Sequence, residues 1–170
     1  MKALLSVFFL VAGWEAVAQS VFSNEINSGI QAVLQDYPND LKNTRGELLA
    51  KRGQTSDYAS RVSIPGVQSA VITESRGSLS WKVTMFKESD FDRATQKFEE
   101  LFRQINKAII KSNDKPFILS GNYSKPGPTR TTVIRFQLLP SMGDLKDVVV
   151  ELSMHRAGRD YVGDINITRR

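Results

Sequence analysis

The chain lacks cysteine entirely and carries a single histidine, His155, among its 170 residues. The absence of cysteine excludes disulfide bonds, a thiolate nucleophile and a lipid anchor attached to a cysteine. One histidine without cysteine leaves no zinc cluster of the usual ligand types. The sequence also contains no nucleophile elbow, no phosphate-binding glycine loop, no dinucleotide fingerprint and no calcium-loop spacing. We therefore expect neither a metal nor a cofactor.

The chain also lacks an apolar run long enough to cross a bilayer, which takes roughly 20 residues. A shorter run at residues 3–14 follows a lysine and precedes the small residues Ala16 and Ala18. This layout is typical of a secretory signal peptide. We predict a cleaved signal peptide at residues 1–18, a single mature domain at residues 19–170, and a periplasmic or secreted location. A buried N-terminal helix is the alternative interpretation, because a glutamate lies close to the predicted cleavage site.

Charge of one sign is not strongly dominant. The 23 basic and 18 acidic residues give a net charge of +5, and the two signs alternate along the chain. Binding to single-stranded nucleic acid uses aromatic side chains interleaved with cations, which this sequence does not offer. We therefore expect no nucleic-acid partner, whereas binding to another polyanion, such as a lipid headgroup or polysaccharide, stays open as an alternative.

Hydrophobic periodicity predicts helices, then strands, then one long helix, then further strands. The first helix is expected to start at a Ser23 cap and to end before Pro38, and a shorter helix is expected at residues 40–52. Residues 57–88 alternate as two or three antiparallel strands, and a long amphipathic helix follows a Ser89 cap. Four strand-like runs follow, at residues 115–124, 129–139, 147–154 and 160–169.

This order predicts an α+β fold with a mostly antiparallel sheet, because short connections require antiparallel neighbours. Each late strand has one apolar and one polar side, which indicates helices packed on one face of the sheet. The order also fits two pseudo-repeated halves, each a helical segment followed by strands, although no residues match between the halves.

The polar side of the last three predicted strands is the candidate binding surface. If those strands are neighbours, their polar side chains share one face of the sheet. These side chains are Arg135, Gln137, Glu151, Ser153, Asp164 and Asn166. His155, expected in a hairpin turn just after a strand, joins them as the one side chain whose ordinary pKa suits a general base near neutral pH.

Three functions compete. The first is a small exported envelope protein of bacteria that acts as a non-enzymatic binding module, taking an unknown protein or small ligand on the polar sheet face or in a sheet–helix groove. The second is a hydrolase that uses His155 or a carboxylate pair. The candidate pairs are Asp90/Asp92, Glu99/Glu100 and Asp144/Asp147. The third is the polyanion binder. The sequence favours a non-enzymatic protein without deciding the question, and it gives no oligomeric state.

Overall fold

The computed structural model describes residues 16–67 and 70–169. The predicted signal peptide lies outside the described residues except for its last three, which begin the first helix, α1 (Ala16–Asp36). No helix in the described part of the chain combines the length and apolar character needed to span a membrane.

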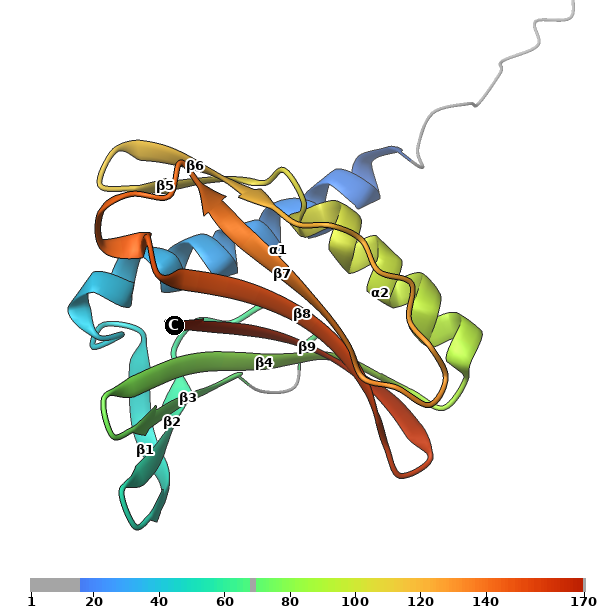
Figure 1. The fold of residues 1–170 in the computed structure, drawn as a ribbon, viewed down its shortest axis with the longest axis horizontal. Coiled ribbons are helices and arrows are strands. Elements are labelled where there is room, and N and C mark those ends of the chain that lie inside the picture. The colour runs from blue at the N-terminus through green and yellow to red at the C-terminus, as the bar shows by residue number, and fades with distance from the viewer. Residues whose placement is uncertain (1–15, 68–69, 170) are drawn as a thin grey trace, which may run out of the picture.

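The described residues form one antiparallel sheet of nine strands, with the order β1-β2-β3-β4-β9-β8-β7-β6-β5 (Figure 1). The fold is therefore α+β and rich in antiparallel sheet, as the sequence predicts. The two longest neighbours at its centre, β4 and β9, come from chain segments about 80 residues apart. The strands are β1 (Arg45–Arg52), β2 (Thr55–Ser60), β3 (Ala70–Ser75), β4 (Ser78–Glu88), β5 (Ile109–Ser112), β6 (Lys115–Ser120), β7 (Thr132–Leu139), β8 (Val148–Ala157) and β9 (Asp160–Arg169).

Alternation along the central strands places one set of side chains in the core. In β7 every second residue from Thr132 to Leu138 is buried, and β8 buries Val150, Leu152 and Met154 in the same way. Trp81 on β4 is wholly buried, and its indole Nε1 donates a hydrogen bond to the Ser60 Oγ. Residues two apart on a strand share a face, so the buried side chains of the strands lie together on one side of the sheet. That apolar side forms one boundary of the hydrophobic core.

The helix α2 (Phe91–Ile105) buries Ala94, Phe98, Leu101 and Ile105 along one stripe. It packs against β4, β8 and β9, and α1 packs against both α2 and β5. Two short 3-10 turns, η1 (Tyr37–Asn39) and η2 (Gly143–Leu145), complete the described elements.

Three predictions about element boundaries are wrong. Ser23 lies inside α1 rather than at its start. The start of α2 is capped by Asp90, whose side chain accepts a hydrogen bond from the Arg93 N–H, and not by Ser89. The helix also ends at Ile105, because Lys107 adopts a left-handed conformation (φ 68°) and donates its N–H to the Leu119 carbonyl. The isoleucines that follow then pair in β5, where β-branched side chains are favoured.

The helix predicted at residues 40–52 is absent. Residues 45–52 form β1, which pairs with β2 through a two-residue turn at Gly53. Gly53 has a φ of 61°, a left-handed conformation that suits a tight hairpin. Gly46 lies against the Ala59 carbonyl, where an added Cβ would approach to 2.9 Å, so the close approach of β1 to β2 depends on this glycine. Long-range pairing with β2 outweighs the weak helical pattern of this segment.

Candidate functional site

The register brings the predicted binding residues onto one face of three adjacent strands. Arg135 of β7 lies directly opposite Glu151 of β8, which in turn lies opposite Asn166 of β9. Ser153 of β8 lies opposite Asp164 of β9. Residues directly opposite one another on neighbouring strands share a face. We call this surface the polar face, and Gln137 and His155 belong to it because they lie two residues along their strands from other members.

The neighbouring strand β4 extends the polar face with two residues that the sequence did not connect to it. Lys82 lies opposite Asn166, and Thr84 lies opposite Asp164. The alternation within β4 marks both as polar-side residues. The sequence contains no signal for the pairing of β4 with β9, because these strands meet across about 80 residues of intervening chain.

Asp164 is the centre of the polar face. Its carboxylate is only 2% exposed, although it belongs to a strongly hydrated residue type. The Thr84 hydroxyl donates a hydrogen bond of 2.7 Å to Oδ1, and the Lys82 Nζ lies 3.0 Å from Oδ2. A buried carboxylate without such partners is costly, so these contacts explain how the charge is tolerated.

His155 lies inside β8, opposite Val162, and not in a hairpin turn as predicted. The turn falls at Gly158, which takes a φ of 65°. The His155 Nδ1 lies 3.6 Å from the Asp164 Oδ2, so the ring is next to a carboxylate that can orient it. In the described chain no serine or threonine hydroxyl is hydrogen-bonded to this ring, so the geometry supplies a base and an orienting carboxylate without a bonded nucleophile.

A second row of the polar face runs toward the β2 end of the sheet. Thr73 lies opposite both Asp57 and Ser80, and Ser80 lies opposite Thr168. The Thr73 hydroxyl donates to the Asp57 Oδ1 at 2.8 Å. This bond, together with a smaller contribution from Arg52, lowers the pKa of the Asp57 carboxyl below its usual value. Asp57 therefore keeps its charge at a lower pH than an ordinary aspartate does.

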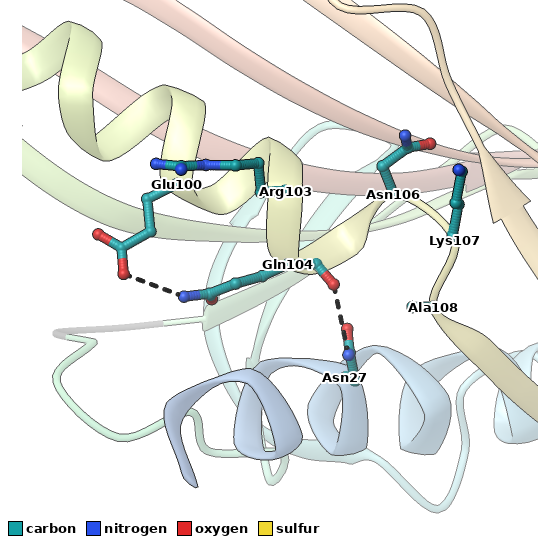
Figure 2. Close-up of a pocket in the computed structure, with 7 residues that line it drawn as sticks. All are labelled: Asn27, Glu100, Arg103, Gln104, Asn106, Lys107 and Ala108. Carbon is teal, nitrogen blue, oxygen red and sulfur yellow. Dashed lines mark hydrogen bonds between the residues drawn. The ribbon is translucent and has the colours of Figure 1, made fainter. Parts of the chain in front are cut away.

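The sheet–helix groove that the sequence left open corresponds to a cavity of about 260 Å³ between β4 and α2, lined by Met85, Phe86 and Leu101. A separate polar cavity of about 540 Å³ lies between α1 and the end of α2 (Figure 2). The Asn27 side chain of α1 donates to the Gln104 carbonyl at 3.4 Å, and the Gln104 side chain donates to Glu100 at 3.3 Å. Arg103 and Lys107 also line it. None of the polar-face residues reaches this cavity, so the two candidate sites are separate.

The predicted carboxylate pairs are spread over the molecule. Asp90 caps α2, and Asp92 lies in the first turn of that helix, where the helix dipole stabilises a negative charge. Asp144 and Asp147 line a cavity of about 650 Å³ at η2, together with Arg169. Among the described residues no group of three or more histidine or carboxylate side chains is arranged to hold a metal ion.

Comparison with known proteins gives no relative for this chain. No protein-family model, no curated protein and no solved structure matches it.

Proposed function

We propose that the protein is a small exported module of the bacterial cell envelope that binds a partner protein through the polar face. The observation that carries this proposal is that all seven residues selected from the sequence meet on one surface of three adjacent strands. The Arg135 Nε lies 2.7 Å from the Glu151 Oε1, so members of the surface hold one another in place. Such pre-organised polar side chains lower the entropy cost of docking.

Shape supports a protein partner over a small molecule. Small-molecule sites are concave and enclose most of their ligand. Five cavities in the described part of the chain, including the one in Figure 2, are lined by residues outside the polar face. A broad sheet surface with mixed charges and exposed aliphatic neighbours such as Val133 instead fits a protein surface, whose recognition combines an apolar centre with a polar rim.

The proposal includes two finer features of the fold. In it, α1 and α2 both cover the apolar side of the sheet, which leaves the polar face open to a partner; the contacts of α2 with β4, β8 and β9 support this arrangement. The chain is also taken as two halves that each begin with a helix and continue with strands, an order that the succession of elements supports.

A hydrolase is the second candidate, because the His155 Nδ1 lies 3.6 Å from the buried Asp164 carboxylate. An imidazole oriented by a carboxylate is a common general base. His155→Ala separates the two functions. It should abolish any hydrolysis that depends on this ring, whereas docking, which is spread over the seven residues of the polar face, should weaken only in part.

Site-specific photo-crosslinking in cells that export the chain tests the proposal. A photoreactive residue replaces Gln137 or Val133, both exposed on the polar face, and Gln96 on the exposed side of α2 is the matched control. We expect one discrete protein adduct from both polar-face positions and none from Gln96. An adduct that forms equally well from Gln96, or no adduct from either polar-face position, contradicts the proposal. Adducts with lipid or polysaccharide in place of a protein, lost in moderate salt, point to the polyanion binder instead.

A further inference from the structure

The sheet has two edges, and α1 covers one of them. In the edge strand β5 the backbone N–H and carbonyl of Lys111 point away from the sheet. Unpaired groups of this kind can bind a strand of another chain. Two glutamines one turn apart on α1 form hydrogen bonds with the N–H and the carbonyl of Lys111. The Lys111 N–H donates to the Gln31 Oε1 at 3.2 Å, and the Gln35 Nε2 donates to the Lys111 carbonyl at 2.9 Å. The outward backbone groups of Lys111, near the middle of the β5 edge, are therefore satisfied within the chain.

The opposite edge, β1, has no such cover in the part of the chain that the structure describes. Its only pairing partner among the described strands is β2. At its first residue the Arg45 N–H donates to the Leu41 carbonyl at 2.9 Å, so the open part of the edge begins after Arg45. Two adjacent leucines, Leu48 and Leu49, are 53% and 54% exposed. The register against β2 shifts on both sides of Leu48, which explains why neither leucine turns into the core. An open edge with adjacent exposed leucines favours pairing with another strand.

The sequence of β1 is complementary to itself when it is read antiparallel about Leu49. Glu47 then lies opposite Lys51 of the second copy, and Lys51 lies opposite Glu47. Leu49 lies opposite itself on the symmetry axis, and Leu48 lies opposite Ala50. Opposite charges that face each other across strands stabilise a pair, whereas like charges there destabilise it. A two-fold interface is self-complementary in this way, because each contact occurs twice.

We propose that β1 is a dimer interface, at which β1 pairs antiparallel with β1 of a second copy around a two-fold axis at Leu49. The occupant of the edge is thus another copy of this chain. The dimer would hold one continuous sheet formed by both copies, and each of its two edges would be a β5 strand beside α1. Further copies could not add through β1, so the assembly stops at a dimer. The interface lies at the far end of the sheet from β7 and is independent of the partner-binding role proposed for the polar face.

Charge reversal and rescue test the interface. Sedimentation equilibrium should show a reversible dimer for the wild type. Glu47→Lys and Lys51→Glu each place like charges opposite one another twice, and each should weaken dimerisation by at least about tenfold, which corresponds to about 1.4 kcal/mol. The double variant restores opposite charges and should return to within about threefold of the wild type. Glu99→Lys on α2 makes the same change of charge away from β1 and should have no effect.

The absence of cysteine permits a second, covalent test. Opposed residues of an antiparallel pair have Cα atoms about 4.5–5.5 Å apart, within the range that a disulfide spans. A Leu49→Cys variant should therefore form an intermolecular disulfide under mild oxidation, whereas Leu139→Cys, an exposed leucine of β7, should not. A monomeric wild type at all concentrations, equal crosslinking of both cysteine variants, or failure of the double charge variant to recover would overturn the proposal.

Discussion

The Nζ of Lys82 lies 3.0 Å from the Oδ2 of Asp164 and joins the two central strands across their polar side. The carboxylate is buried, whereas the lysine side chain is 54% exposed. Thr84, beside Lys82 on the same face of β4, donates its hydroxyl to the other carboxylate oxygen. The polar face therefore has a fixed centre, at the point where the two halves of the sheet meet.

Removal of Asp164 should destabilise the protein more than removal of Lys82. Asp164→Ala leaves the Thr84 hydroxyl without its acceptor and should lower the free energy of unfolding by about 1–3 kcal/mol. Lys82→Met should cost about 1 kcal/mol or less, because water screens the half-exposed amine. Urea denaturation of both single variants and the double variant gives their coupling energy. If the two losses add within about 0.3 kcal/mol, the ion pair makes no contribution.

Gly163 of β9 allows the ring of Phe86 to lie against the strand. A Cβ at this position would come within 2.2 Å of the Phe86 Cε1, and the pairing of β4 with β9 shifts register between Thr84 and Phe86. Gly163→Ala should therefore lower the free energy of unfolding by about 1–3 kcal/mol through overpacking, measured by thermal or urea denaturation. In a Phe86→Leu background the same change should cost clearly less. An equal cost in both backgrounds would show that the ring is not the cause.

The sequence predicted the local elements better than their partners. Alternation in the late strands identified the polar side of β7, β8 and β9, because side chains two apart on a strand share a face. The same alternation in β4 marked Lys82 as polar-side, but only the pairing of β4 with β9 reveals its contact with Asp164. An isolated glycine within a strand, such as Gly163, indicates a bulge or close approach. The identity of the ring that packs there depends on tertiary structure.

The two mistaken helix predictions share one physical cause. The segments 40–52 and 106–112 have apolar side chains that fit a helix when they are considered alone, yet residues 45–52 and 109–112 pair as the strands β1 and β5. Pairing with β2 and β6 gives the backbone N–H and carbonyl groups of these segments hydrogen-bond partners. The free energy gained by this pairing exceeds the small preference of their residues for a helix. His155 was placed in a turn because β8 continues for three residues beyond Met154, where its apolar alternation ends.

The hydrogen bond between Thr73 and Asp57 should make the stability of the protein depend on pH in the acid range. The pKa of Asp57 is lowered, chiefly because the Thr73 hydroxyl donates to its carboxylate and secondarily because of Arg52. Since the folded-state pKa is below the ordinary value of 3.8, this group stabilises the fold above pH 3.8, and the stabilisation is lost as the pH falls through the folded-state pKa. Thr73→Val should raise the pKa of Asp57 more than Arg52→Gln does, in an NMR titration of the carboxyl carbon. A larger effect of Arg52→Gln would reverse the order of causes.

Alkaline unfolding should depend on Tyr37, which is 1% exposed and donates its hydroxyl to the Leu79 carbonyl. Burial raises the pKa of Tyr37 to about 12, and nearby Arg169 opposes that rise only in part. Because the folded-state pKa exceeds the ordinary value of 10.0, the neutral phenol stabilises the fold fully below pH 10, and this contribution declines as the pH rises toward about 12.

Tyr37→Phe should therefore be less stable than the wild type at pH 8, by about 1 kcal/mol for the lost hydrogen bond. Between pH 10 and 12 the wild type should lose about 3 kcal/mol that the variant keeps, since each pKa unit corresponds to about 1.4 kcal/mol. The two stability curves from urea denaturation should consequently cross in this range. Parallel curves from pH 8 to pH 12 would show that the Tyr37 phenol ionises as readily in the folded protein as in the unfolded chain.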